Sequence, residues 1–414
     1  MRDEQDTRGG EGGAGAAGGP VPVEVAAWRE FCHTLEALGD RLLTDEFPET
    51  DEDRVEGFSH LARLASCWLA WTVTHGDARF PTFQRHNDLV GIWGGPNVDN
   101  AYHHARIDPR RRYRIRGRMH SCEDFILAVR AGFMHRRKWG TLVEVTASEI
   151  GIGRGDEFEL LLGGDPPDGD TTGGLRHVAL PDEAVMVSIR EYYFDWQADE
   201  PATFVIDCLD DLEPPGRLGA EVLASRLAEA AAETEDSVVY WNRYMKEAKA
   251  ERTDNSFAAS LQVAKGLASA RYAFCFWELE PGQALYVETT VPNARYWSLQ
   301  LYTLGWFEPP DVLTRVAAIN HVQTDVDPDG LVRAAVSAED PSIANWLDTG
   351  GRRSGLLTLR WFWPEGPAPE PVARVVPIEE VRTVAHESDR RPDAEERRAE
   401  VERRREHLLW RFRT

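Results

Sequence analysis

The stretch DNAYHHARIDPRRRYRIRG, residues 99–117, decides the fold class because its side chains alternate with a period of two. Successive side chains of a β-strand point to opposite faces, so AYHHARI and RYRIRG each predict a strand. Between them, Asp108 and Pro109 supply the residues of a turn. We therefore predict the two arms of a β-hairpin. Tyr113 and Ile115 point inward, and the arginines form a solvated face paired with local carboxylates.

The same alternation separates two adjacent histidines, His103 and His104. Their side chains point to opposite faces, so they cannot chelate one metal ion together, and the chain has no HxH or HExxH motif. No metal site and no cofactor are therefore expected. His103 shares a face with the small Ala101 and Ala105, which leave room beside its ring. It is the better candidate for lining a pocket, where an imidazole with a pKa of about 6.5 suits proton transfer.

Composition excludes several classes of protein. The 414 residues carry a net charge of −23, which argues against binding to nucleic acid or anionic membranes, because both need basic residues. The five cysteines are scattered and never spaced as CxxC, so neither a zinc ribbon nor a disulfide framework is expected. The N-terminus lacks the apolar core of a signal peptide, and no apolar run is long enough for a transmembrane helix. We expect a cytoplasmic protein.

Changes in residue patterning divide the chain into alternating helical and β-rich segments. Helical spacing of apolar residues alternates with short period-two segments broken by Gly, Pro and Asp. The sequence predicts an α+β protein with antiparallel, sandwich-like β segments. Its expected parts are a disordered leader (1–22), N-terminal helices (23–85), a first β-rich module (86–215), a helical segment that includes FAASLQVAKGLASARYA (216–272), a C-terminal β-rich module (273–380) and a charged C-terminal helix (388–414).

The two β-rich modules share an order of segments, which suggests a tandem repeat. RRRYRIRGRMHS can be aligned with NARYWSLQLYTL, placing Arg112-Tyr113 opposite Arg295-Tyr296. GDEFELLLGGD then falls opposite PDGLVRAAVSAED, and VMVSIREYYFDW opposite LLTLRWFWPEG, with Arg190 over Arg360. The order and approximate spacing agree along both modules. Chance alternation in two β-rich domains is the alternative.

Three segments of the C-terminal module resemble the domain-of-unknown-function 1214 family: ARYWSLQLYTLGWFE (294–308), DPDGLVRAAVSAEDPSIANWLDTG (327–350) and LTLRWFWPEG (357–366). The earlier GGPNVDNAYHHARIDPRRRYRIRG and SIREYYFDWQADEPATFVID resemble the N-terminal half of actinobacterial members, so the likeness covers roughly residues 53–380. It implies a β-sandwich-like module behind a helical and β-rich N-terminal part, and it brings no settled activity. GRMHS (117–121) departs from the glycine-rich turn expected there and places His120 in an unusual position.

Fourteen tryptophans are unusually many and point to an aromatic-lined pocket. Strand alternation puts Trp361 and Trp363 on one face of their strand, and Arg360 and Phe362 on the other. A tryptophan on a sheet face packs in the core, or it offers a wall for a flat ligand or a cation. An arginine inside an aromatic strand has a fixed fork of donors that can orient a polar ligand group.

The leading hypothesis is a cofactor-independent enzyme or binding protein for a small apolar or alicyclic metabolite, lipid- or terpenoid-like. Lyase or isomerase chemistry by histidine, in secondary metabolism, fits this hypothesis. The expected partner is a small molecule, with no nucleic acid and no membrane, and a homo-oligomer is compatible with the sequence. The alternatives are a carbohydrate-binding or carbohydrate-processing protein and a non-catalytic scaffold whose C-terminal helix docks a partner. The catalytic candidates are His103, His120 and Asp195, and the ligand-binding candidates are Tyr102, His104, Arg190, Trp306, Trp346, Arg360 and Trp361.

Overall fold

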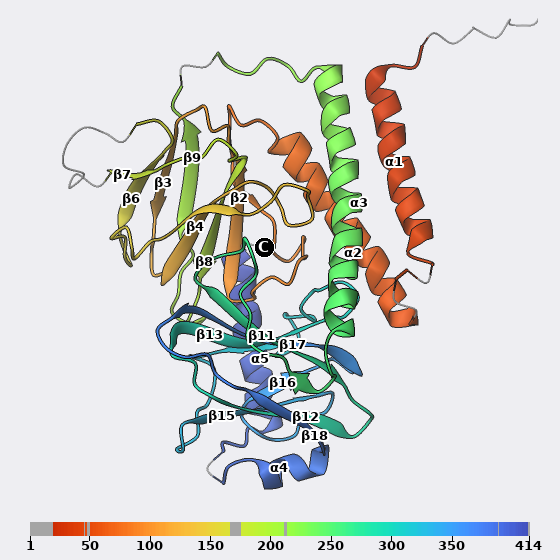
Figure 1. The fold of residues 1–414 in the computed structure, drawn as a ribbon, viewed down its shortest axis with the longest axis vertical. Helices are drawn as coiled ribbons and strands as arrows, with labels where there is room; N and C mark the ends of the chain where they lie inside the picture. Colours follow the sequence, from red (N-terminus) through yellow and green to blue (C-terminus); the bar gives the residue numbers. More distant parts are fainter. Residues whose placement is uncertain are drawn as a thin grey trace, which may run out of the picture.

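A computed structural model describes residues 20–44, 46–47, 50–165, 175–210, 213–387 and 389–412. Most of the expected N-terminal leader lies outside these residues. The described chain is a mixed α+β fold with two β-rich parts, which confirms the predicted fold class. Figure 1 shows the two β-rich parts one above the other along the long axis, with the helix α3 (Ala220–Ala250) beside them.

The other helices are α1 (Val23–Arg41), α2 (Asp51–Leu69), the short α4 (Val381–Val384) and α5 (Ala394–Phe412). α2 begins after Thr50, whose hydroxyl accepts a hydrogen bond from the Asp53 N–H at 3.0 Å, so a free backbone donor is satisfied. Phe31 of α1 packs on Ala230 and Ala231 of α3. No helix among the described residues has both the length and the apolar character needed to cross a membrane.

The helix expected over FAASLQVAKGLASARYA is wrong. Only two short parts of this segment are regular, and both are strands: β10 (Ser256–Phe257) and the start of β11 (Ala270–Glu278). The residues between them form a loop, in which Lys265 takes a left-handed φ of 59°. Ala and Leu favour a helix locally, but β11 buries side chains on both faces of its sheet and pairs along its whole length with a neighbouring strand. Tertiary burial therefore outweighs local propensity.

The N-terminal sandwich consists of two sheets around an apolar core. Alternate strand positions fill this core, among them the fully buried Tyr113, Ile115, Phe125 and Leu127. The five-stranded sheet has the order β1 (Gln84–Arg85), β2 (Asn100–Arg106), β8 (Met186–Tyr192), β4 (Asp124–Arg130), β5 (Thr141–Thr146). The four-stranded sheet has the order β7 (Leu175–Val178), β6 (Glu157–Leu162), β3 (Tyr113–Arg118), β9 (Thr203–Cys208).

The C-terminal sandwich has the same construction. Its core contains the buried Trp277, Leu299, Val336 and Trp361. The five-stranded sheet has the order β10, β11, β17 (Ser354–Pro364), β13 (Ala294–Tyr302), β14 (Ala318–Asn320). The four-stranded sheet has the order β16 (Trp346–Asp348), β15 (Leu331–Ser337), β12 (Gln283–Thr290), β18 (Val372–Pro377).

The strand orders show that the two sandwiches are a tandem repeat. Each strand from β10 to β18 takes the place of the strand numbered nine lower, and in both modules the outer pair, β6–β7 or β15–β16, is parallel. The predicted matches of β6 with β15 and of β8 with β17 are therefore right. The match of Arg112-Tyr113 with Arg295-Tyr296 is wrong, because β3 corresponds to β12 and β13 corresponds to β4. An Arg-Tyr dipeptide that occurs in both modules does not establish that the two strands carrying it are equivalent.

The predicted hairpin of β2 and β3 is also wrong, because the two strands lie in different sheets. The turn itself exists, since the Arg111 N–H donates to the Asp108 carbonyl at 3.0 Å, but it carries the chain from one sheet to the facing one. Tyr113 points inward as expected, and Arg116 pairs with Asp207 at 2.8 Å on the outer face. Alternation thus predicts a strand and its two faces correctly, but it does not predict which strand pairs with it.

The outer faces of the two five-stranded sheets meet directly. Tyr192 of the N-terminal sandwich packs on Tyr296 and Phe362 of the C-terminal sandwich, with ring centroids 5.3 and 5.4 Å away. The helix α5 spans both modules, because Arg404 donates to the Ala318 carbonyl and His407 to the Asp199 carbonyl. The modules are therefore held in one arrangement, which positions the cavity between them.

Candidate functional site

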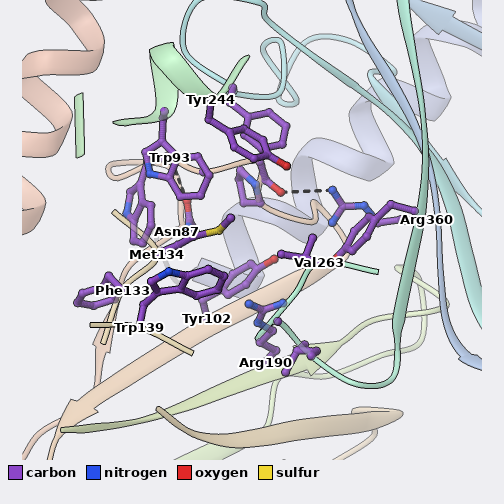
Figure 2. A pocket seen from close by; sticks show the side chains of 18 of the residues that line it. Asn87, Trp93, Tyr102, Phe133, Met134, Trp139, Arg190, Tyr244, Val263 and Arg360 are labelled. Carbon is purple, nitrogen blue, oxygen red and sulfur yellow. Dashed lines mark hydrogen bonds between the residues drawn. The ribbon is translucent and has the colours of Figure 1, made fainter. Parts of the chain in front are cut away.

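A cavity of about 150 Å³ lies beside this contact, between the outer faces of the two five-stranded sheets and α3. The strands contribute side chains at alternate positions, which is why residues from distant parts of the sequence converge there. The loops before β2, after β4 and before β11 complete the walls (Figure 2). The strand residues are Tyr102 and His104 of β2, Arg130 of β4, Arg190 of β8, Tyr272 and Phe274 of β11 and Arg360 of β17.

Three arginines and no carboxylate line the cavity, although the chain as a whole is strongly acidic. Arg130, Arg190 and Arg360 form no ion pair with any residue that the structure describes. The Arg190 guanidinium lies over the Tyr102 ring at 5.3 Å, and the Arg360 guanidinium lies over Tyr272 at 5.6 Å. The negative ring faces stabilise these cations in part, but they do not neutralise them.

Two of these arginines, Arg360 and Arg130, differ in their hydrogen bonds. Arg360 is 4% exposed and donates to the Gly95 carbonyl at 3.3 Å and to the Tyr302 hydroxyl. Arg130 makes no hydrogen bond to a described residue through its buried Nε. Burial, and then repulsion by the neighbouring Arg190, lower the pKa of Arg130 to about 9. A pKa of about 9 leaves Arg130 cationic at neutral pH, as arginine side chains in proteins generally are.

His104 lines the same cavity and is 6% exposed. Burial lowers its pKa well below the usual value, and the nearby His86, Arg130 and Arg190 lower it further. The imidazole is therefore neutral at pH 7. Its Nδ1 has no hydrogen-bond partner among the described residues. A neutral imidazole has one ring nitrogen that can accept a proton, and burial and the adjacent cations make this imidazole a weaker base than an exposed one.

Aromatic rings form the wall opposite Arg360. Figure 2 shows Trp93, Phe133 and Trp139 on the side of the cavity away from this arginine. Gly94 and Gly95, with φ values of 69° and 62°, bring the backbone against the rings of Trp241 and Phe307. A Cβ atom on Gly95 would lie 2.2 Å from the Phe307 ring, so no larger residue fits there without a shift.

Several buried nitrogen atoms of the residues that line the cavity have no hydrogen-bond partner in the described part of the chain. In addition to His104 Nδ1 and Arg130 Nε, they are Trp241 Nε1 and Arg360 Nε. The indole and guanidinium nitrogens are donors only. Unsatisfied buried donors are costly, so their concentration at one cavity favours a ligand that brings acceptors.

Part of the chain matches a known protein family. The sequence model of the family described as "Protein of unknown function (DUF1214)" matches residues 281–366. These residues form a DUF1214 segment. They include Arg360 and most of the C-terminal sandwich, so the resemblance predicted for that module is confirmed.

The fold likeness extends beyond the DUF1214 segment. A crystal structure of an uncharacterized protein from Burkholderia cenocepacia is 26% identical, with a TM-score of 0.77 over 86% of this chain and 98% of that chain. A protein from Vibrio parahaemolyticus is 12% identical, with a TM-score of 0.45 over 77% of this chain and 98% of that chain. No protein of curated function matches the chain.

Four of the ligand-binding candidates from the sequence lie together in the cavity: Tyr102, His104, Arg190 and Arg360. Period-two alternation placed Tyr102 and His104 on one face of their strand, and the structure agrees. The preferred catalytic candidate, His103, lies on the opposite face. Its Nε2 is 2.5 Å from Glu191 Oε1, beside the core of the N-terminal sandwich. The small Ala101 and Ala105 accompany it because that face packs inward, and they do not open a pocket.

The remaining candidates lie away from the cavity. His120 lies in the β3–β4 connection with a left-handed φ of 50°, and its Nδ1 is 3.8 Å from Glu200 Oε2. Asp195 lies in a turn, where its carboxylate accepts a hydrogen bond from the Gln197 backbone N–H. Trp306 is buried under α2, where its indole donates to the Asp53 carbonyl. Trp346 donates to the Ser337 carbonyl at an edge strand, and Trp361 is buried in the C-terminal core.

The expected common face of Trp361 and Trp363 is wrong. Trp363 takes a left-handed φ of 54°, so alternation ends at Phe362, and the Trp363 ring packs on Tyr192 at 4.9 Å on the outer side of the sheet. Sequence reasoning also missed Arg130 and the walls from the loops and α3. Arg130 ends the apolar run FILAV at an outward position, which alternation from Ile126 would have indicated. The loop and helix residues carry no such signal.

Proposed function

We propose that the protein binds a small organic anion with a flat apolar body in this cavity, and that His104 exchanges a proton with it. The observation that carries the proposal is a set of three arginines that form no ion pair with a described residue, in a cavity whose described lining contains no Asp or Glu. Guanidinium forks bind carboxylate and phosphate groups with good geometry. The aromatic wall of Trp93, Phe133 and Trp139 suits the apolar body of such a ligand.

His104 gives the site its capacity for acid–base chemistry. A neutral imidazole can remove a proton from a carbon beside the anionic group, and the arginines would then stabilise the negative charge that develops. This step needs no cofactor. It fits lyase or isomerase chemistry on a small metabolite, including one of secondary metabolism, in the cytoplasm.

The two alternative functions have less support. Recognition of a sugar would call for carboxylate or amide side chains beside the tryptophans. The described lining has no carboxylate, and Asn87 Oδ1 already accepts the backbone N–H of Trp93 at 2.9 Å. A scaffold that docks a partner through its C-terminal helix would need apolar residues free on that helix. Leu408 and Phe412 of α5 are instead buried against the rest of the chain, and Trp410 is the large apolar residue of the described helix that is left exposed.

The test compares Arg190→Met with Arg106→Met by isothermal titration calorimetry, with benzoate as the probe. Arg190 makes no hydrogen bond or ion pair to a described residue, so its loss should leave the fold intact and weaken benzoate about tenfold or more. Arg106 is the matched control. It shares the outer face of β2 but pairs with Glu229 at 2.6 Å and stacks on Trp71. Equal benzoate binding by the wild type and Arg190→Met would refute the proposal.

The proton exchange has a separate test. Mass spectrometry of the compound released from native protein should give an anion. Incubation of that compound with enzyme in D₂O should introduce deuterium, and His104→Gln should abolish this exchange while binding persists. Exchange at the wild-type rate in His104→Gln would remove His104 from the mechanism.

A further inference from the structure

The cavity is bounded by two matching Tyr–Arg pairs, one from each copy of the repeat. Tyr102 lies directly opposite Arg190 in the β2–β8 register, and Tyr272 lies directly opposite Arg360 in the β11–β17 register. In both pairs the guanidinium lies over the ring, at 5.3 and 5.6 Å. Because the outer faces of the two sheets meet, the pairs enter one cavity from opposite sheets.

The charge of the cavity exceeds what one anionic group can compensate. Arg130 adds a third guanidinium next to Arg190. The described Glu144 carboxylate raises the pKa of Arg130, but it accepts hydrogen bonds from Ala268 and Ser269, lies outside the cavity lining and forms no ion pair with the arginine. Like charges in a partly dry site repel strongly. A ligand with a single negative charge would leave most of this repulsion in place, and a ligand with two would remove most of it.

We infer that the ligand is a dianion with two carboxylate groups on one nearly flat ring that keeps a C–H beside a carboxylate, with one carboxylate for each Tyr–Arg pair. This inference rests on the proposed function and specifies its substrate class. A cavity near 150 Å³ is of a size that holds a benzene ring in other proteins, so a single ring fits between the aromatic walls. Arg190 and Arg360 stand on different sheets, which favours two separated carboxylates over the compact charge of one phosphate.

The experiment measures the affinity of the full-length protein for benzoate, for each of the three benzenedicarboxylate isomers and for inorganic phosphate. One dicarboxylate isomer should bind about tenfold to a hundredfold more tightly than benzoate, because it adds one charge-assisted arginine contact. In Arg190→Met the ratio of dicarboxylate affinity to benzoate affinity should fall to about one. In Arg106→Met this ratio should be unchanged. Arg360→Lys keeps the charge without the fork and should lower the preference in part, while folding is monitored by thermal unfolding.

Each other outcome is decisive. Equal affinity for benzoate and all three isomers would overturn the dianion and leave the anion-binding function standing. Tighter binding of phosphate than of any dicarboxylate would overturn the dicarboxylate assignment. Retention of the full preference in Arg190→Met would overturn the role of the paired arginines. Failure of the whole panel to bind would overturn both this inference and the proposed function.

Discussion

The two sandwiches present the same strands to the cavity, and part of their chemistry is shared. Arg190 and Arg360 occupy equivalent positions on the central strands β8 and β17, and each faces a tyrosine on the neighbouring strand. The repeat thus supplies one Tyr–Arg pair twice. Because the equivalent faces of the two modules pack against each other, the two Tyr–Arg pairs lie on opposite sides of one cavity.

The neighbouring positions differ, and the difference separates binding from chemistry. His104 of β2 corresponds to Phe274 of β11, and Arg130 of β4 corresponds to Tyr302 of β13. The N-terminal sandwich therefore adds a proton acceptor and a further cation, and the C-terminal sandwich adds aromatic surface. The DUF1214 segment contains Arg360 but none of the other charged cavity residues, so the family match alone covers only part of the site.

The largest expected effect concerns the inward faces of the central strands. Trp361 of β17 corresponds to Glu191 of β8, which is buried with His103 and Tyr193. Trp361→Ala should lower the free energy of unfolding by about 3–5 kcal/mol through the cavity it leaves. Glu191→Gln should cost about 1–3 kcal/mol, because one charged hydrogen-bond acceptor is weakened. Denaturant unfolding measures both costs, and equal costs would contradict the assignment of Trp361 to core packing and of Glu191 to a polar contact beside an otherwise apolar core.

The next largest effect is a substitution that should raise the free energy of unfolding. Arg130 places a partly buried cation beside Arg190 without an ion-pair partner among the described residues, so Arg130→Met should stabilise the ligand-free protein by about 1–3 kcal/mol. The same variant should bind the anion more weakly, which is the usual exchange between stability and function at a site. Thermal unfolding and calorimetry test the two halves. A destabilised variant would mean that Arg130 has a structural role.

The sequence predicted most of the strands, most of their faces and the repeat, because period-two alternation reports burial directly. It placed Arg190 over Arg360 and grouped Tyr102 with His104. The sequence-based predictions failed where a feature depends on contacts with another strand or sheet. The partner of β3, the packing of the face that carries His103 and the turn at Trp363 all depend on which sheet lies opposite, and no local pattern encodes that.

The cavity walls were beyond local patterns for the same reason. Trp93, Trp241 and Phe307 come from a loop, a helix and another loop, and they meet only after both sandwiches and α3 have packed. Tryptophan count indicated an aromatic pocket, but it did not separate Trp93 in the wall from Trp361 in the core.

A smaller effect distinguishes His104 from Phe274 by pH. The pKa of His104 is lowered in the folded protein, so below about pH 6.5 the unfolded chain takes up a proton that the folded chain does not. Stability should therefore fall as pH drops below that value. His104→Phe should make this slope shallower by up to about 1.4 kcal/mol per pH unit. Phe274→Leu, at the equivalent position, should leave the slope unchanged. Chemical unfolding at a series of pH values measures it, and an unaltered slope in His104→Phe would show that this histidine is protonated in the folded state.

The smallest effect compares the two tyrosines of the Tyr–Arg pairs. The Tyr102 hydroxyl accepts the Asn97 N–H at 2.7 Å, so Tyr102→Phe should cost about 1 kcal/mol of stability. The Tyr272 hydroxyl has no hydrogen bond to a described residue, so Tyr272→Phe should change stability by less than about 0.5 kcal/mol. Both variants keep the ring under the guanidinium, and anion affinity should therefore stay within about twofold in each. A large loss of affinity in Tyr272→Phe alone would show that its hydroxyl contacts the ligand, and the two halves of the site would then differ in binding as well as in proton transfer.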